Sequence, residues 1–197
     1  MAGGAPTSLT AATASKVLSG FRPRTGTDRI RVALAKDLST GIRRLDQQLA
    51  ANTAAITAIL DEHGTRRGEV PGVGPVLEGR LLGRTGTPSR FASDASSANY
   101  TGTAPVQIAS AETDRHRLSR YGDRQLNSAI QTVAMFQIRM PGSAGRAYYD
   151  TKIAAGKSPR SAARALNRHL SRHLWRVTIA DEKRSARKPS KTDAEPA

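Results

Sequence analysis

The sequence predicts a mainly α-helical fold, in which a long coiled-coil-like arm precedes a compact domain with at most one small β-hairpin. Apolar residues between positions 28 and 63 recur every three, four or seven residues, as they do along one stripe of a helix. Stretches 125–140 and 158–179 repeat this helical period, whereas 104–110 alternates as a strand does. We expect residues 1–8 to be disordered, 9–63 to form the arm, 64–180 to form the compact domain and 181–197 to be a disordered basic tail.

The arm is predicted as one long helix because Gly41 is its only glycine or proline between residues 28 and 63. A single apolar stripe on so long a helix needs a partner, so we expect a coiled-coil hairpin or a homo-oligomer. The charged positions mix both signs, which is typical of a solvated face. The stripe comprises Ile30, Leu34, Leu38, Ile42, Leu45, Leu49, Ile56 and Ile59.

A glycine-rich turn follows the arm. Residues 70–75 read Val-Pro-Gly-Val-Gly-Pro, and a helical period resumes directly afterwards. In a helix-hairpin-helix module such a turn presents backbone N–H groups to a DNA phosphate, which makes Gly72 and Gly74 candidate phosphate contacts. The alternative is an ordinary tight turn in which both glycines supply positive φ.

The middle of the compact domain is predicted to hold a short helix, a hairpin and a core helix. Ser93–Tyr100 begins with a Ser or Asp cap, and 104–110 is a strand with 115–120 as its return strand. A helical period beginning at Gln125 predicts the core helix, which Pro141 ends. Its stripe comprises Leu126, Ile130, Val133, Phe136, Gln137 and Met140.

The last predicted helix carries an arginine every four residues. At 100° per residue these arginines fan over roughly 160° of the helix surface. No acidic residue lies between Thr151 and Ala180 to neutralise them within the helix, and like charges at this spacing oppose helix formation. The series therefore indicates a phosphate-binding face. It comprises Arg160, Arg164, Arg168, Arg172 and Arg176.

The overall charge also indicates a polyanionic partner. The chain has 31 Lys and Arg against 16 Asp and Glu, a net charge of +15, and the last 57 residues carry more than half of it. Nucleic acid is the first candidate partner and an acidic membrane surface the second. The membrane is disfavoured because the arginine face has few apolar side chains apart from Trp175. No stretch reaches the ~18 apolar residues of a membrane helix, so no membrane partner is expected.

Other kinds of site are not expected in this chain. The absence of cysteine excludes disulfides, cysteine zinc sites and thiol catalysis, and favours a reducing cytoplasm. His169 and His173 are four residues apart but lack a metalloprotease glutamate and a third ligand. Residues 156–158 imitate the end of a P-loop, but Thr151 stands where its first glycine should be. We expect no metal, cofactor or small-molecule substrate.

Ser110 is the candidate nucleophile. It follows the predicted strand, in a loop that leads to a group of arginines, and a serine hydroxyl can attack a phosphodiester while guanidinium groups stabilise the charge on phosphorus. A surface serine that lies near basic residues by chance would give the same pattern, so the residues alone leave both interpretations open. The arginines are Arg115, Arg117, Arg120 and Arg124.

Several blocks in order resemble the C-terminal transposase domain of the bridge-RNA-guided insertion-sequence transposases, relatives of the Piv-type DNA invertases. The resemblance covers about residues 9–180, with 9–61 similar to the helical linker of that family. The blocks are Pro71–Pro75, Arg90-Phe91, Tyr100–Val106, Ser110, Arg115–Arg120, Gly122–Asn127 and Gly145–Tyr149.

The resemblance implies a prokaryotic, cytoplasmic and nucleoid-associated recombinase that binds DNA and a structured guide RNA. Ser110 falls at the family's nucleophilic serine, and Arg120, Gly122 and Arg124 match its basic segment; Ala111 stands where glycine is common. The family's Mg²⁺ belongs to a RuvC-like domain with four acidic ligands. This chain begins in the linker, which leads us to expect a fragment, a decayed copy or a misassigned start. The alternative function is a noncatalytic helix-hairpin-helix-type nucleic-acid-binding module.

Overall fold

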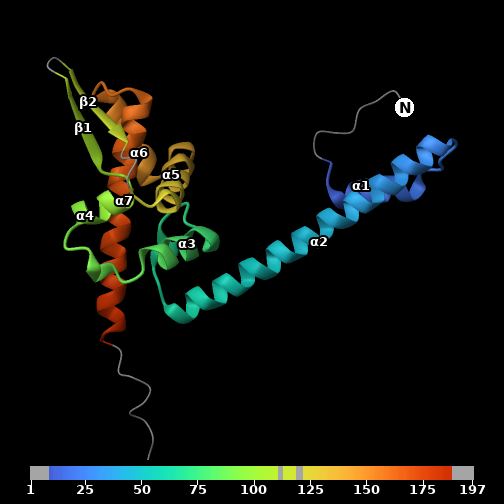
Figure 1. Cartoon of the computed structure of the whole chain (residues 1–197), viewed down its shortest axis with the longest axis horizontal. Coiled ribbons are helices and arrows are strands. Elements are labelled where there is room, and N and C mark those ends of the chain that lie inside the picture. Colours follow the sequence, from blue (N-terminus) through green and yellow to red (C-terminus); the bar gives the residue numbers. More distant parts are fainter. Residues whose placement is uncertain (1–8, 111–112, 119–121, 188–197) are drawn as a thin grey trace, which may run out of the picture. The chain divides into compact units, whose positions relative to one another are not determined.

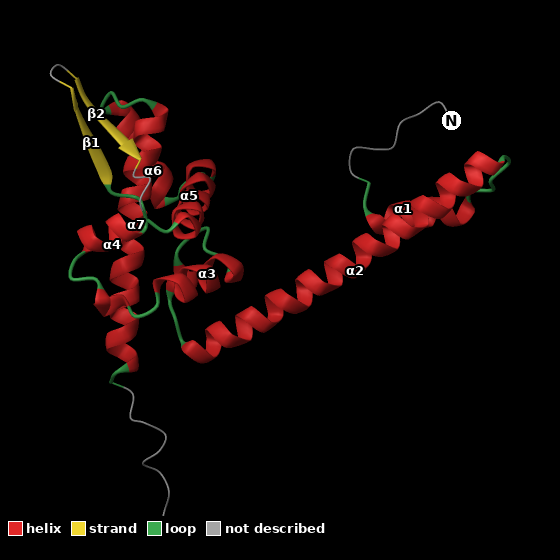
Figure 2. Cartoon of the chain, viewed as in Figure 1, coloured by secondary structure: helices red, strands yellow, loops and turns green. Residues whose placement is uncertain are grey.

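The computed structural model describes residues 9–110, 113–118 and 122–187; residues 106–110 and 113–118 are described by their backbone. It confirms the predicted mainly α-helical fold, and Figure 2 shows one two-stranded hairpin among the described helices. The chain divides into an N-terminal unit, residues 1–55, and a C-terminal unit, residues 56–197. The division therefore falls inside the long helix and not after residue 63. Each unit is described by itself.

The N-terminal unit contains helix α1 (Ala11–Gly20) and most of helix α2 (Gly26–His63). Thr10 caps α1 with its side-chain oxygen, which accepts a hydrogen bond from the backbone N of Thr13 at 3.2 Å. Helix α2 begins with Thr25 and Asp28, each of whose side chains accepts a hydrogen bond from the other's backbone N at 3.0 and 3.1 Å. This reciprocal cap fixes the helix start, and α2 covers the whole of the helix predicted over 28–63.

The apolar stripe of α2 is exposed within the N-terminal unit. Ile30 is 72% exposed and Leu49 is 65% exposed, although both occupy the positions that a packed helix buries. Between them Leu34, Leu38, Ile42 and Leu45 are also exposed. The predicted stripe is thus present on the helix, and its residues from Ile30 to Leu49 are exposed among the described residues of this unit.

The C-terminal unit is built around helix α7 (Pro159–Ser185), against which α4 (Asp94–Tyr100), α5 (Arg124–Arg139) and α6 (Ala144–Ala154) all pack. Figure 1 shows this arrangement, with α3 (Pro75–Thr85) next to α5. Two short 3₁₀ turns, η1 (Arg67–Glu69) and η2 (Pro88–Arg90), also contact α7.

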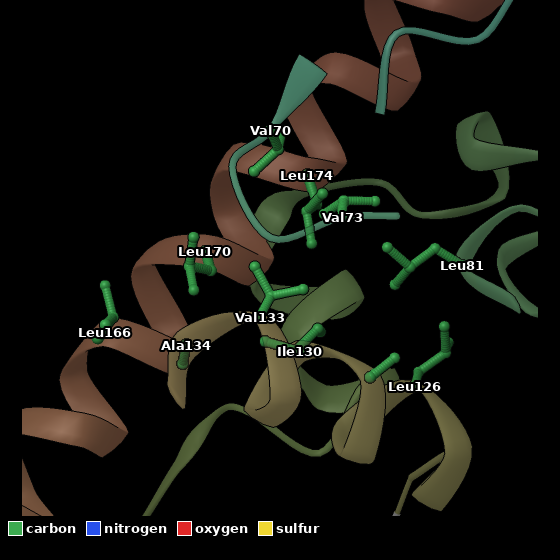
Figure 3. Close-up of a cluster of buried hydrophobic side chains, with 11 residues drawn as sticks. Val70, Val73, Leu81, Leu126, Ile130, Val133, Ala134, Leu166, Leu170 and Leu174 are labelled. Carbon is green, nitrogen blue, oxygen red and sulfur yellow. The ribbon is translucent and has the colours of Figure 1, made fainter. Parts of the chain in front are cut away.

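The core of this unit lies between α3, α5 and α7, as Figure 3 shows. Leu126, Ile130 and Val133 of α5 and Leu166 of α7 are almost completely buried. Each such side chain contributes roughly 1.5–3 kcal/mol to the free energy of unfolding. The remaining members of the cluster are Val70, Val73, Leu81, Ala129, Ala134, Leu170 and Leu174.

Two expectations about the helices need correction. Phe136 and Met140 belong to the predicted core stripe of α5 but are 52% and 41% exposed. The buried side of α5 is formed instead by Leu126, Ala129, Ile130, Val133, Ala134 and Gln137. The basic tail expected from residue 181 begins later, because α7 continues to Ser185. Asp181 is buried and accepts hydrogen bonds from Thr65 Oγ1 and the backbone N of Arg66 at 3.1 and 3.0 Å, which holds the end of α7 against the chain after α2.

Candidate nucleic-acid interface

The predicted hairpin consists of β1 (Pro105–Ser110) and β2 (Thr113–Leu118), paired antiparallel. Ser110 pairs with Thr113 at the far end of the ribbon, so the candidate nucleophile occupies the last ladder position before the connection. Arg115 pairs with Ile108 and Arg117 with Val106. Because paired residues share a face and faces alternate along each strand, Ser110, Arg115 and Arg117 hold register positions on one face.

Both ends of the hairpin are attached to the helices beside it. The side-chain amide of Asn127, on α5, donates hydrogen bonds to the backbone oxygens of Thr101 and Gly102, each at 3.1 Å. On the other strand, the backbone N of Asp123 donates to the oxygen of Tyr100 at 2.7 Å. These bonds join the residues before β1 to the residues after β2, so the base of the ribbon is fixed.

Buried hydroxyl groups attach this base to the central helix. Thr101 Oγ1 lies 3.0 Å from Thr103 Oγ1 and 3.1 Å from Ser171 Oγ on α7. All three residues are buried, so their hydroxyls satisfy one another in place of water. The sequence block around Tyr100–Val106 therefore has a structural explanation, which the sequence alone did not provide.

Asp123 connects the hairpin base with α3 and α5. Its Oδ1 accepts hydrogen bonds from the backbone N of Gln125 and of Leu126, capping α5, and its Oδ2 accepts from Arg84 Nε at 2.7 Å. Desolvation raises the pKa of this carboxyl, but the hydrogen bonds from Leu126 and Arg84 and the positive charge of Arg84 outweigh that effect. The net result is a pKa below the ordinary value.

Removal of this carboxylate is expected to destabilise the C-terminal unit. Asp123→Ala loses the cap and the ion pair and should lower the free energy of unfolding by about 1–2 kcal/mol near neutral pH. Asp123→Asn is the matched control, because asparagine caps a helix about as well and only the half-exposed ion pair is lost. Urea unfolding followed by the fluorescence of Trp175, the single tryptophan, measures both.

The same variants test the direction of the pKa. A carboxyl with a lowered folded-state pKa stabilises the fold above its unfolded value of about 4 and loses that contribution as the pH falls through the folded value. The difference between wild type and Asp123→Ala should therefore shrink below about pH 4. A difference that stays constant from pH 7 to pH 3 would contradict this assignment.

Arg90 packs against two aromatic residues near α4. Its guanidinium carbon lies 4.5 Å from the ring centroid of Phe91 and 4.4 Å from that of Tyr100, and the two ring centroids are 5.2 Å apart. The guanidinium thus stacks on both rings at the end of α4. Sequence reasoning found the Arg90-Phe91 block by resemblance but did not predict this cluster.

The two glycines of the predicted phosphate-binding turn differ in conformation. Gly72 has φ +87°, and a Cβ there would lie 2.8 Å from Cδ1 of Phe136. Gly74 has φ −88°, is the N-cap of α3 and has open space around it, so the expectation of positive φ at both glycines is wrong. Close packing against Phe136 accounts for Gly72.

The arginine series on α7 has acidic neighbours that the sequence did not reveal. Asp94, at the start of α4, places Oδ2 3.1 Å from Arg168 Nη2 and 3.2 Å from Arg172 Nε. The prediction concerned acids within the helix, and Asp94 belongs to a different helix. Two of the five arginines are therefore partly neutralised by a residue about 75 positions earlier.

The remaining predicted contacts are distributed over several places. Arg164 donates a hydrogen bond to Ser161 Oγ at 3.2 Å, while Arg160 and Arg176 are exposed near the start and in the second half of α7. Arg124 is the exposed first residue of α5, next to the hairpin base. Arg120 lies outside the described residues. The structure thus separates the predicted arginines into a hairpin group and an α7 group.

The apparent P-loop at residues 156–158 is the turn between two helices. Gly156 follows α6 with φ +82°, and the Ser158 side chain caps α7 by accepting from the backbone N of Ser161. Within the described part of the chain, no group of three or more His, Asp or Glu could hold a metal ion. No described helix combines the length and apolar character needed to cross a membrane.

Comparison with known proteins identifies the central part of the chain. Residues 68–150 match the family model described as Transposase IS116/IS110/IS902 family. A protein of Sinorhizobium fredii named "Putative transposase y4pF/y4sB" is 29% identical over 151 residues, which are 75% of this chain and 38% of that relative. The chain thus spans well under half the length of this relative. Residues 68–150, which hold the glycine turn, the hairpin and the core helix, therefore match the transposase domain of the IS116/IS110/IS902 family.

Proposed function

We propose that this chain is the part of an insertion-sequence transposase that binds DNA and a structured guide RNA, and that Ser110 is its nucleophile for strand transfer. The proposal is supported above all by the position of Ser110 at the end of β1, inside the stretch that matches the transposase family. Arg115 occupies the position diagonal to Ser110 on the opposite strand, about 7–8 Å away in such a ladder. The two positions therefore lie on the same face of the ribbon.

The chemistry proposed for Ser110 is a transesterification. Its Oγ forms a bond to the scissile phosphorus, the bond from phosphorus to one deoxyribose oxygen breaks, and the hydroxyl proton passes to solvent. The released deoxyribose oxygen takes up a proton and becomes a hydroxyl. The hydroxyl of a DNA end from the partner duplex later attacks the phosphoserine, forms the new phosphodiester bond and releases the Ser110 oxygen, which regains its proton. Arg115, Arg117, Arg120 and Arg124 are proposed to stabilise the charge on the pentavalent phosphorus.

The remaining contacts proposed with nucleic acid are electrostatic. The exposed Arg160 and Arg176 are available to phosphates as they stand, whereas Arg168 and Arg172 would have to exchange Asp94 for a phosphate. A helix-hairpin-helix-type phosphate contact through Gly72 and Gly74 also belongs to this proposal. Mg²⁺ would be held by a separate RuvC-like domain, and we propose no metal site among the described residues of this chain.

We also propose that the chain forms a homo-oligomer through α2. The exposed stripe runs from Ile30 to Leu49, a rise of about 28 Å along the helix, which is long enough for a coiled coil. Residues 28–63 carry five basic and five acidic side chains, so this helix has no net charge for a polyanion to cancel. A second copy of this helix can bury the stripe with its own apolar residues, and because neither helix has a net charge, the two copies do not repel each other.

Formation of a covalent adduct tests the catalytic proposal. The protein is incubated with end-labelled duplex DNA from either side of its coding sequence and with a separately supplied RuvC-like protein, then separated on a denaturing gel. We expect a labelled adduct with wild type and none with Ser110→Ala. Ser128→Ala, which removes an exposed serine of α5, is the matched control and should form the adduct normally.

The outcome distinguishes the two functions considered. If neither wild type nor Ser110→Ala forms an adduct while both bind the DNA, the chain is a noncatalytic nucleic-acid-binding module. Binding itself should weaken steeply as salt increases, because phosphate contacts release counterions. Affinity that does not change with salt would argue against phosphate contacts altogether.

A further inference from the structure

A positively charged surface lies where α6 and α7 pack together, on residues that sequence reasoning did not connect. The rings of Tyr148 on α6 and His169 on α7 are stacked, with centroids 4.6 Å apart and planes 22° from parallel. Lys152, one turn further along α6, places Nζ 5.1 Å from the centroid of Tyr148. We name Tyr148, Lys152, His169, His173 and Arg176 the α6/α7 surface.

Three of these residues form a stripe along α7. His169, His173 and Arg176 follow one another at steps of four and three residues, so they share one face of the helix. All three are exposed. Together they extend about 10 Å along the axis, which corresponds to about three nucleotides of one strand at 3.4 Å each.

Positive charge surrounds His169. Burial is the largest cause that lowers the pKa of His169, followed by the positive charges of His173, Arg172, Arg176 and Lys152. Every charged neighbour therefore opposes protonation of this imidazole.

The nearest acids are already paired. Asp94 of α4 faces Arg172 at 3.2 Å, and Asp150 of α6 forms an ion pair with Arg146 at 2.7 Å. Within the described residues, neither Lys152 nor Arg176 makes an ion pair with an acid. The α6/α7 surface thus brings together Lys152 and Arg176, which form no ion pair with the acids whose side chains the structure describes.

We propose that the α6/α7 surface binds the phosphodiester backbone of nucleic acid, as a site separate from the hairpin. A phosphate next to His169 offsets the repulsion among the cations and favours the protonated form of this imidazole. The tyrosine stacks on the His169 ring, and the half-buried Lys152 of α6 and the exposed Arg176 of α7 both act on the charge of that ring. The inference rests on the proposed function in one respect, that the chain's polyanion is nucleic acid.

The site predicts tighter binding at lower pH. Because the pKa of His169 is lowered in the free protein and a bound phosphate raises it, binding takes up protons. Affinity for nucleic acid should therefore rise as the pH falls from about 8 to about 6. Replacing both histidines by glutamine (His169→Gln with His173→Gln) should remove most of this rise.

The test measures binding of the full chain to two fluorescent probes, a 20-base-pair duplex DNA and a stem-loop RNA, by anisotropy. Lys152→Gln with Arg176→Gln removes two cations of the surface. Each lost phosphate contact reduces the slope of log K against log salt by about 0.9 on duplex DNA and weakens binding about eightfold near 0.1 M salt. The double variant should therefore bind duplex DNA about 60-fold more weakly, and the probe with the larger loss identifies the natural source of the phosphates.

The matched control removes the same charge elsewhere. Arg22→Gln with Arg24→Gln changes two exposed arginines of the N-terminal unit and should leave affinity and salt slope nearly unchanged. Equal losses in the control and the surface variant would show an effect of net charge alone and overturn the inference. So would wild-type affinity in the surface variant, while an unaltered Ser110 adduct would leave the proposed function intact. If wild type binds neither probe, the inference and the proposed function both fail.

Discussion

Replacing Gly122 with alanine is expected to lower the free energy of unfolding of the C-terminal unit by about 3 kcal/mol or more. Gly122 has φ +120°, a conformation that residues with a Cβ rarely adopt. A Cβ at this position would lie 2.8 Å from the oxygen of Tyr100 and 2.9 Å from both the oxygen of Asn99 and the nitrogen of Gly102. All three are backbone atoms, so no side chain can rotate away to make room.

Two control variants separate the causes of this loss. Gly156 has φ +82°, and a Cβ added there would meet open space. Gly156→Ala should therefore lower the free energy of unfolding by about 1–2 kcal/mol through the backbone conformation alone. Gly83→Ala lies within α3 with open space and should stabilise the protein by roughly 0.5–1 kcal/mol. Urea unfolding followed by Trp175 fluorescence ranks the three. Equal losses for Gly122→Ala and Gly156→Ala would show that the close backbone approach is unimportant.

The same substitution connects stability with the proposed chemistry. Gly122 follows β2 at the point where the hairpin base meets the end of α4, so an added Cβ displaces the backbone that holds the ribbon. We therefore expect Gly122→Ala to reduce adduct formation by Ser110 even at temperatures where the helices remain folded.

The sequence predicted well those elements whose signals are local. Helix α4 begins as predicted because the Ser93 side chain accepts from the backbone N of Ser96 while Ser96 bonds back to Ser93. The hairpin was predicted because alternation over 104–110 is followed by a second polar and charged run, and both strands form. In both cases residues within about ten positions determine the structure.

Helix α6 was missed because its local pattern is weak. Only Gly145 of its eleven residues is buried, so no apolar stripe marks the helix, and the Ser143 cap is a single residue. Tyr148 is the aromatic residue of this helix that packs on α7. A single aromatic residue cannot establish a helical period in the sequence. The α6/α7 surface includes residues of this helix, so the sequence did not predict that surface either.

Contacts between residues far apart in the chain could not be predicted from the sequence, for a different reason. The ion pairs of Asp94 with Arg168 and Arg172, and the approach of Gly72 to Phe136, join positions more than 60 residues apart. Such contacts depend on how helices pack, which periodicity along one helix does not encode. The catalytic role proposed for Ser110 likewise came from resemblance to a family, since a lone serine beside arginines is common on protein surfaces.

Two aspartates placed in the stripe of α2 are expected to dissociate the proposed homo-oligomer. Leu38→Asp with Leu45→Asp puts two charges at contact positions one heptad apart in the coiled coil, and each charge is present in every copy. Burial of one leucine contributes roughly 1.5–3 kcal/mol, so the dissociation constant should rise at least 1000-fold. Sedimentation over a range of protein concentrations measures this change directly.

Thr40→Asp with Gln47→Asp is the matched control for the stripe. It introduces the same two charges with the same seven-residue spacing, but each is two positions further along α2. Two residues correspond to a rotation of about 200° around the helix axis, so these charges point away from the stripe. The control should associate as wild type does, because these positions lie on the polar side of the helix. Circular dichroism should show lower helicity in the stripe variant alone, since a long helix without its partner loses the packing that sustains it. A wild-type chain that stays monomeric at all concentrations, or a control as dissociated as the stripe variant, would refute the self-association of α2.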